Sequence, residues 1–393
     1  MACIVMGVTG GIAAYKSAEI ASTLKKAGHD VYVIMTEHAT QFITPLTFET
    51  LTNHPVVVDM FTRETPWEVE HISLAKRADV FLVAPASANF LGKYANGIAD
   101  DMLTTTILAT KAPVVLAPAM NTNMWANPIV QKNKEILQGF GVKMVGPASG
   151  YLACGDIGQG RMCDPDEIVD AVYDALVEKD FAGKHVLVTA GPTRETVDPV
   201  RYITNHSSGK MGYAIAKMAK RRGAQVTLIH GPVSLSVPYG VTECAVESTQ
   251  DMLEAVKAHF PQCDLLIMAA APADFAIKEQ SDHKIKKVDG APMIWQLKQT
   301  QDILGAISEH RKEQVVVGFA AETNDVQAYA ADKLRRKRLN MIVANDVTQK
   351  GAGFGTDTNI VTIVHQDGRI LPHDIASKEE IAGFILDEVK SYF

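Results

Sequence analysis

Residues 2–20, ACIVMGVTGGIAAYKSAEI, decide the fold class of this 393-residue chain. An apolar run, residues 2–8, reads as a buried strand, and the glycine turn after it leads into a helical pattern. A second apolar run, HDVYVIMT at 29–36, follows that helix. The order strand, glycine loop, helix, strand is typical of a βαβ unit in a parallel sheet.

A second start of the same kind lies roughly 180 residues later. KHVLVTAG at 184–191 reads as a strand, and a long loop ends in NHSSGKMG at 205–212. The helix at 213–223 and the strand at 224–231 complete the unit. Because one doubly wound sheet has one first unit, two of them predict an α/β protein with two Rossmann-like domains, each a mostly parallel sheet flanked by helices.

The joint between the domains is predicted at the helix that starts DPDE. Asp164 is expected as its N-cap, Pro165 as its first residue and Glu167 as the partner in a capping box. The helix is expected to end near Lys179, with DFAGK as the hinge. We therefore expect domains at 1–181 and 182–393.

Composition excludes several classes of protein. A hydrophobic content of 47%, with 21% charged residues, is typical of a globular protein with full cores, and the net charge of −7 argues against general nucleic-acid binding. The five cysteines have no zinc-ligand spacing, which favours a reducing cytoplasm. The N-terminus reads as a strand, and the longest apolar run, LLIMAAAPA, is too short to cross a membrane.

Polar strand ends predict a ligand pocket in the first half. Ligands of doubly wound sheets gather at the carboxyl ends of strands, here expected at Thr9, Thr36, Ala84 and Ala117. A hydroxyl at Thr36, where a dinucleotide fold carries an acid, favours a mononucleotide such as FMN. The alternative interpretation of TGGIAA is a tight turn that binds no ligand. The segment also lacks the GxGxxG motif, which argues against an oxidoreductase with two NAD-type domains.

Four segments of this half resemble the flavin-containing cysteine decarboxylase family: VEHISLAKRAD at 69–79, the segment at 84–106, PAMNTNMW at 118–125 and ACGDIGQGRM at 153–162. The resemblance implies an FMN site at a subunit interface of a trimer. It implies flavin contacts at five positions: Gly10, Gly11, Thr36, Ser87 and Asn89. The catalytic positions it implies are His71, Asn121 and Cys154.

Each catalytic position also has a structural alternative. His71 could be a surface residue of a helix, Asn121 a turn residue and Cys154 an incidental loop cysteine. In the functional interpretation, Asn121 and His71 orient the substrate, and Cys154 donates a proton from a glycine-rich lid that Arg161 anchors.

The second half lacks a Walker motif, because Met211 follows Lys210 in SSGKMG. The helix start there favours an anion or, alternatively, is a plain helix cap. Basic runs at 284–287 and 333–338 come without an aromatic platform, so they indicate a triphosphate site more than nucleic acid.

Segments of this half resemble the phosphopantothenate–cysteine ligases: residues 191–212, AAAPADF at 269–275, KIKK at 284–287 and VGFAAET at 317–323. The resemblance implies CTP as activator, Mg²⁺ at Asp274, an acyl-cytidylate positioned by Asn205, and the substrate phosphate at Arg201. The implied CTP contacts are Ala273, Asp274, Lys284, Gln301, Asp302, Ile303, Leu304, Phe319, Lys333 and Lys337. Gln301 departs from the proline of the family pattern, so side-chain roles at 301–304 stay open.

The whole chain thus resembles the bifunctional bacterial enzymes of coenzyme A synthesis that combine these two activities. The resemblance implies small-molecule substrates and a homo-oligomer, with trimers of the first half and dimers of the second; a dodecamer would combine them. A flavoprotein scaffold without activity is the remaining alternative.

Overall fold

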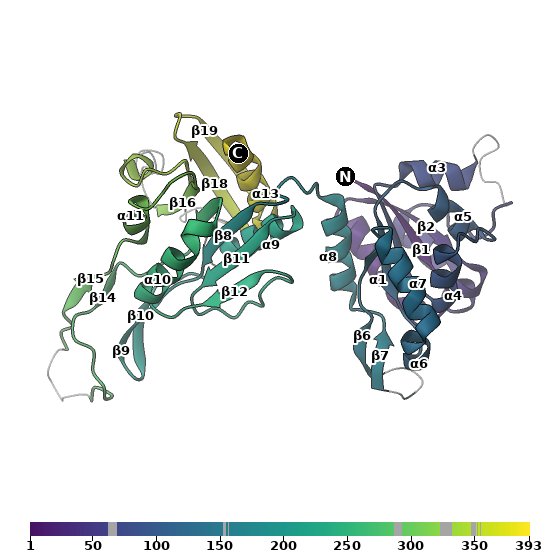
Figure 1. Ribbon diagram of the computed structural model, residues 1–393, viewed down its shortest axis with the longest axis horizontal. Coiled ribbons are helices and arrows are strands. Elements are labelled where there is room, and N and C mark those ends of the chain that lie inside the picture. Colours follow the sequence, from purple (N-terminus) through teal and green to yellow (C-terminus); the bar gives the residue numbers. More distant parts are fainter. Residues whose placement is uncertain are drawn as a thin grey trace. The chain divides into compact units, whose positions relative to one another are not determined.

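A computed structural model describes residues 1–61, 69–151, 155, 157–286, 293–322, 332–346, 351, 353 and 355–393. They form two compact units, Met1–Glu178 and Lys179–Phe393 (Figure 1). No helix of these residues is both long and apolar enough to cross a membrane.

The first unit is built on a five-stranded parallel sheet in the order β2-β1-β3-β4-β5. Its strands are β1 (Cys3–Val8), β2 (Asp30–Met35), β3 (Val80–Ala86), β4 (Val114–Pro118) and β5 (Lys143–Met144). Its helices are α1 (Ala14–Lys26), α2 (Pro45–Thr52), α3 (Glu70–Arg77), α4 (Ala88–Ala95), α5 (Met102–Ala109), α6 (Thr122–Ala126), α7 (Pro128–Gly139) and α8 (Pro165–Leu176), with the 3₁₀ turn η1 (Glu37–Gln41). A hairpin of β6 (Ala148–Tyr151) and β7 (Ile157–Arg161) precedes α8.

The second unit contains an eight-stranded sheet in the order β12-β11-β8-β13-β16-β17-β18-β19. Its strands are β8 (His185–Ala190), β11 (Gln225–His230), β12 (Thr242–Ala245), β13 (Leu265–Met268), β16 (Val315–Glu322), β17 (Met341–Asp346), β18 (Thr358–His365) and β19 (Ile370–Ser377). All neighbours pair in parallel except β17–β18 and β18–β19. The helices are α9 (Lys210–Arg221), α10 (Thr249–His259), α11 (Ile303–Ser308) and α13 (Lys378–Val389), with the 3₁₀ turns η2 (Phe260–Gln262) and η3 (Lys390–Tyr392).

Two short antiparallel pairs belong to the second unit but not to its large sheet. They are β9 (Arg194–Asp198) with β10 (Arg201–Thr204), and β14 (Phe275–Ile277) with β15 (Leu297–Gln299). Figure 1 shows both extending away from the large sheet. The β9–β10 pair contains Arg201, the predicted substrate-phosphate residue, and β14 begins directly after Asp274.

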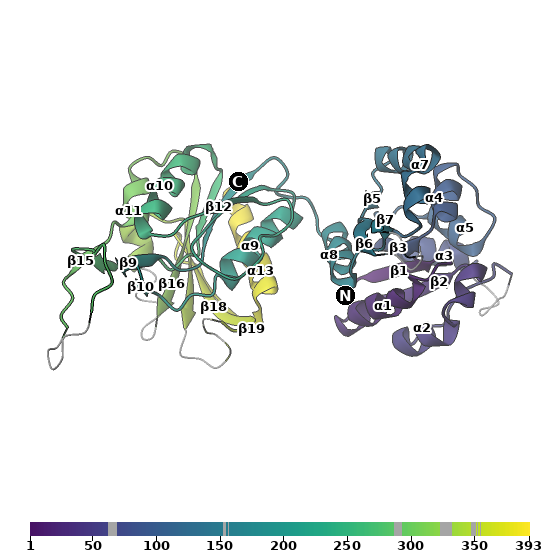
Figure 2. The same ribbon diagram turned by 90° about the horizontal axis from the view of Figure 1, so that it is seen from below.

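Both sheets are buried on their two faces, which explains the continuous apolar runs of their strands. In the first unit Ile4 and Met6 pack with residues of α1, α2 and α8, whereas Val5 packs with residues of α4, α5 and α7. Figure 2 shows α1 and α2 on one side of β1 and β3, and α4 and α7 on the other.

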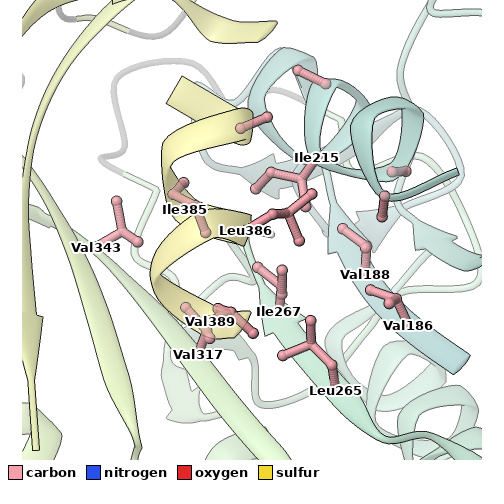
Figure 3. Close-up of a cluster of buried hydrophobic side chains, with 14 of the residues drawn as sticks. Val186, Val188, Ile215, Leu265, Ile267, Val317, Val343, Ile385, Leu386 and Val389 are labelled. Atoms are coloured by element: carbon pink, nitrogen blue, oxygen red, sulfur yellow. The ribbon is translucent and has the colours of Figure 1, made fainter. Parts of the chain in front are cut away.

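The second unit repeats this arrangement with α9 and α13 on one face. Val186 and Ile267 of the sheet pack there against Ile215 of α9 and Leu386 of α13 (Figure 3). Leu187, one residue along β8, faces the other side and joins α10 and α11. The predicted fold class, two Rossmann-like domains with mostly parallel sheets, is confirmed.

Two central strands of the second unit extend beyond their neighbour β13. Strand β16 continues to Glu322, and strand β17 continues to Asp346. The reason is that β16 and β17 pair with each other beyond the point where β13 ends opposite Gly318. Phe319 therefore lies within a strand.

The capping box predicted for α8 is wrong. Asp164 is the N-cap and Pro165 follows it, but the Asp164 side chain accepts no capping hydrogen bond. It lies instead 3.4 Å from both Lys16 Nζ and Arg161 Nη2. The helix ends at Leu176, before the expected Lys179.

Candidate active sites

The first unit has a pocket of about 1100 Å³ at the carboxyl ends of its strands. Residues after β1, β2, β3 and β4 line it, as the strand order predicts. All five predicted flavin contacts are among them: Gly10, Gly11, Thr36, Ser87 and Asn89. Asn121 lines the same pocket.

Two glycines give the turn after β1 its shape. A Cβ on Gly10 would lie 2.6 Å from His38 Cβ and 3.0 Å from the His38 carbonyl carbon, so only glycine lets this turn approach η1. A Cβ on Gly11 would meet nothing within 4 Å. The turn is therefore packed on one side and open on the other, which suits the close approach of a ligand to backbone.

Three hydroxyls at strand ends hold the backbone around the pocket. Thr9 Oγ1 donates to the Pro85 carbonyl at 2.7 Å and accepts from the Ser87 N–H at 3.0 Å. Thr36 Oγ1 caps η1 by accepting from Ala39 N at 3.3 Å, and Ser87 Oγ caps α4 by accepting from Phe90 N at 3.3 Å. Thr9 therefore joins the ends of β1 and β3, whereas Thr36 and Ser87 each cap the helical segment that follows their own strand.

The three predicted catalytic residues differ in how the structure places them. Asn121 is the N-cap of α6, and its Oδ1 accepts from Asn123 N at 2.8 Å, which orients the amide. His71 lies half-buried near the start of α3 and is not among the described residues that line the pocket. Cys154 lies outside the described residues.

An ion-pair cluster on the pocket wall was missed by the sequence analysis. Lys93 of α4 contacts Asp100 at 2.7 Å and Asp101 at 3.2 Å, and Asp101 also caps α5 through Thr104. Burial lowers the pKa of Lys93, but the two carboxylates raise it more, so its net pKa is above its ordinary value. The spacing of Lys93 from the two aspartates could have suggested this cluster.

The pocket fits FMN by its size and donors. Its volume of about 1100 Å³ exceeds the roughly 300–1,000 Å³ typical of a site for one small ligand. The open glycine turn precedes α1, where free backbone N–H groups favour a phosphate.

The second unit has its own pocket, of about 840 Å³. It is lined by nine of the ten predicted CTP contacts: Ala273, Asp274, Gln301, Asp302, Ile303, Leu304, Phe319, Lys333 and Lys337. It is also lined by Arg336 of the basic run at 333–338, by Lys210 of the SSGKMG helix start and by Lys378, which the sequence analysis did not single out. This concentration of positive charge suits a polyphosphate.

A hydroxyl network holds the Ala273–Asp274 part of the wall. Ala273 N donates to Thr193 Oγ1 at 2.9 Å, and the Ala273 carbonyl accepts from Thr300 Oγ1 at 2.6 Å. Thr300 N also donates to the Asp274 carbonyl at 3.0 Å. Beneath them Thr249 bonds to Thr193 and to the buried carboxylate of Glu195. Thr300 thus joins the two wall segments at 273–274 and 301–304.

The basic run at 333–338 is tied to the opposite wall. Lys333 Nζ donates to the Phe319 carbonyl at 2.8 Å, and Lys337 pairs with Asp302. Burial raises the pKa of Asp302, but Lys337 lowers it more, so its net pKa lies below the usual range. Asp302 therefore keeps its negative charge and orients Lys337.

Three predicted residues are not among the described residues that line this pocket: Lys284, Asn205 and Arg201. Asn205 is nevertheless next to it, because its Nδ2 donates to the Ala271 and Pro272 carbonyls at 3.2 and 3.0 Å. Lys284 is exposed.

Arg201 and the segment that holds Lys284 meet at one buried carboxylate. Asp198 accepts from the N–H groups of Val200, Arg201 and Ile285, and Arg201 Nη2 donates to the Ile285 carbonyl at 3.1 Å. Burial raises the pKa of Asp198, but the three N–H donors lower it more, so it stays charged. The chain next to Lys284 is therefore anchored to the β9–β10 pair.

The helix start at SSGKMG forms another part of the wall. Gly209 is the N-cap, with φ of +77°, and Lys210 is held by Asp357 at 2.7 Å and the Gly355 carbonyl at 2.8 Å. Lys378 is buried and donates to the Thr358 carbonyl at 3.0 Å. Burial, followed by the nearby Lys210, lowers the pKa of Lys378.

Acidic, histidine and cysteine side chains form no cluster of three suited to a metal within the described part of the chain. Asp274 is exposed on the pocket wall, so a metal held there would need ligand oxygens from the nucleotide itself.

Comparison with known proteins gives the family. Residues 2–177 match the flavoprotein family, and residues 181–392 match the "DNA/pantothenate metabolism flavoprotein C-terminal domain" family. The "Coenzyme A biosynthesis bifunctional protein CoaBC" of Bacillus subtilis is 51% identical over 390 residues, 98% of this chain and 96% of the relative. The chain belongs to the family of bifunctional coenzyme A biosynthesis proteins.

Other proteins are similar to all or part of this chain. The protein of the same name from Escherichia coli is 45% identical over 393 residues, 98% of this chain and 96% of the relative. A crystal structure of the C-terminal domain of such a protein is 44% identical and covers 55% of this chain and 97% of its own, with a TM-score of 0.47. A structure described as an FMN-dependent cysteine decarboxylase, SpaF, is 33% identical and covers 44% of this chain and 97% of its own, with a TM-score of 0.40. The resemblance and the two activities predicted from the sequence are confirmed at the level of this family.

Proposed function

We propose that each unit performs one of two successive steps of coenzyme A synthesis. The second unit joins 4'-phosphopantothenate to L-cysteine with CTP, and the first unit decarboxylates the product to 4'-phosphopantetheine with FMN. The observation that carries this proposal is that each unit has its own pocket at the carboxyl ends of its own sheet, one open to a flavin and the other strongly basic.

In the ligase step the substrate carboxylate attacks the α-phosphate of CTP, which releases pyrophosphate and forms an acyl-cytidylate. The amine of cysteine then attacks the acyl carbon and displaces CMP. Lys333, Lys337 and Arg336 bind the triphosphate, because they concentrate positive charge on one wall. Asp274 binds Mg²⁺ together with phosphate oxygens. Asn205, fixed by two carbonyls, orients the acyl-cytidylate.

In the decarboxylase step Gly10, Gly11, Thr36, Ser87 and Asn89 hold FMN, which when bound supplies a reversible hydride acceptor. Asn121 donates its amide N–H to the substrate carboxylate and His71 orients the thiol. The Cys154 thiol delivers a proton to the substrate carbon after CO₂ leaves.

The resemblance associates the decarboxylase family with trimers. His71 is not among the described residues that line the pocket of its own chain. We therefore propose a homo-oligomer in which a partner's His71 completes the site, with ligase dimers joining the trimers.

The test uses the purified full chain with FMN, 4'-phosphopantothenate, cysteine and CTP, followed by product mass. We expect the cysteine adduct and then its decarboxylated product.

Lys284→Gln should abolish CTP-dependent ligation but spare decarboxylation of added 4'-phosphopantothenoylcysteine, because a lysine beside the anchored Ile285 can reach a polyphosphate as a point charge. Lys278→Gln, also exposed but outside the pocket wall, is the matched control. Ligation by Lys284→Gln at the control rate would remove Lys284 from the site.

A further inference from the structure

Two basic side chains on the wall of the first pocket share one acid. Lys16 of α1 and Arg161 at the end of β7 both line the pocket, and both face Asp164. These residues are brought together by the fold, since Lys16 and Asp164 are 148 positions apart. No flavin or catalytic role given above uses Lys16, and Arg161 was expected only to anchor the lid segment.

Asp164 makes only long contacts with these two basic side chains. Its oxygens lie 3.4 Å from Lys16 Nζ and 3.4 and 3.5 Å from Arg161 Nη2. Charge-assisted N–H···O bonds are about 2.7–2.9 Å long, so these contacts are loose. The Asp164 side chain is also 57% exposed, and exposed ion pairs of this kind contribute little to stability.

Lys93, the other lysine on this wall, behaves differently. It is held at 2.7 Å by Asp100 and has a second carboxylate in Asp101. Two full negative charges therefore oppose one positive charge there, whereas at Asp164 one negative charge opposes two positive ones. The excess positive charge on the pocket wall lies at Lys16 and Arg161.

We propose that Lys16 and Arg161 bind the phosphate monoester of the decarboxylase substrate, displacing Asp164. A phosphate carries up to two negative charges and presents oxygens to both the fork of Arg161 and the ammonium of Lys16. The inference rests on the proposed decarboxylase function, whose substrate carries such a phosphate at the end away from its cysteine.

The pocket contains a second candidate phosphate, that of FMN. The glycine turn at Gly10 and Gly11 leaves backbone N–H groups for it without help from Arg161. Arg161 instead ends β7, on a different element from the glycine turn. The pocket volume of about 1100 Å³ is above the roughly 300–1,000 Å³ typical of a site for one small ligand.

The experiment compares 4'-phosphopantothenoylcysteine with pantothenoylcysteine, which lacks the phosphate, as substrates of the full FMN-loaded chain. The readout is the ratio of the two kcat/KM values. We expect wild type to favour the phosphorylated substrate and Lys16→Gln and Arg161→Gln each to lower the ratio about tenfold or more, the loss of one charge-assisted contact. Lys16→Arg should keep most of the preference, and Asp164→Asn should lower KM for the phosphorylated substrate only. Lys25→Gln, on the same helix and outside the pocket wall, should leave the ratio unchanged.

A second arm measures binding of FMN and riboflavin to flavin-free protein by flavin fluorescence. The proposal expects Lys16→Gln and Arg161→Gln to bind FMN as wild type does. Weaker FMN binding with unchanged riboflavin binding would assign the pair to the flavin phosphate and overturn the proposal. If either variant loses kcat/KM equally with both substrates, the proposal is also overturned, because an equal loss indicates a structural role. Turnover of neither substrate by wild type would overturn the decarboxylase function itself.

Discussion

Asp180 joins three segments of the second unit through one carboxylate. It pairs with Arg222 after α9 and, at 3.0 Å, with Lys390 after α13, while Arg222 also reaches Asp387 at 2.6 Å. The hydrogen bond from Arg222 is the largest cause that lowers the pKa of Asp180 from 3.8 to about 2. The carboxylate therefore stabilises the folded state in its charged form.

We expect Asp180→Asn to lower the free energy of unfolding of the second unit by about 2 kcal/mol at pH 7. Because the folded pKa is depressed, this stabilisation is complete above the ordinary pKa of 3.8 and is lost as pH falls towards about 2. Hydrogen exchange of α9 and α13 amides, measured on both proteins at several pH values, checks this. A difference between them that stays constant down to pH about 2 would contradict the assignment.

At the scale of elements, α9 approaches β8 more closely than a side chain at position 212 allows. A Cβ on Gly212 would lie 2.5 Å from Ala190 Cβ and 2.9 Å from the Thr189 carbonyl oxygen. Both atoms belong to β8, so neither can move cheaply. This contact sets the position of the helix start that forms part of the ligase pocket.

We therefore expect Gly212→Ala to destabilise the second unit by about 1–3 kcal/mol, the usual cost of overpacking. Gly383→Ala in α13 is the matched control, because a Cβ there meets nothing within 4 Å. That change should be neutral or stabilise by about 0.5–1 kcal/mol, since alanine favours a helix over glycine. Urea unfolding measures both, and equal effects of the two changes would show that the close contact carries no energy.

Thr300 links two wall segments of the ligase pocket through its hydroxyl and its N–H. Thr300→Val removes the bond to the Ala273 carbonyl but keeps the shape and the backbone bond to Asp274. We expect ligase kcat/KM for CTP to fall about tenfold, with decarboxylase activity unchanged, because the buried Ala273 carbonyl loses its short donor at 2.6 Å and keeps only Thr249 Oγ1 at 3.3 Å. Thr300→Ser should restore activity through its hydroxyl. If serine and valine variants are equally impaired, the methyl group and not the hydrogen bond positions the wall.

At the scale of the molecule, the two units divide between Glu178 and Lys179, and the family matches end at 177 and begin again at 181. The boundary predicted at residue 181 would leave Phe181 with the first half. In the structure Phe181 is 1% exposed in the core of the second unit, with Phe393 at 5.9 Å from ring to ring and Arg222 over its face.

We predict that a fragment of residues 179–393 is more stable than one of residues 182–393 by about 3 kcal/mol or more, the cost of removing a buried phenylalanine. Residues 1–178 should bind FMN without the second unit. Thermal unfolding of the two ligase fragments and flavin absorbance of the first unit check these outcomes. Equal stability of the two fragments would show that the segment at 179–181 contributes nothing to the second core.

The fold class and the position of the first pocket could be predicted from the sequence. Apolar strands, glycine turns and polar strand ends are local features, and parallel strands bring their carboxyl ends to one edge whatever the remaining contacts are. Thr36 was therefore predictable as a pocket residue from its strand end, whereas Gly10, Ser87 and the run at 301–304 were expected through the family resemblance. Tertiary structure alone decided the partners of Asp164, the hydroxyl network around Ala273 and the place of Phe181. These depend on side chains that are far apart along the chain, and their directions are set by packing, which local sequence does not encode.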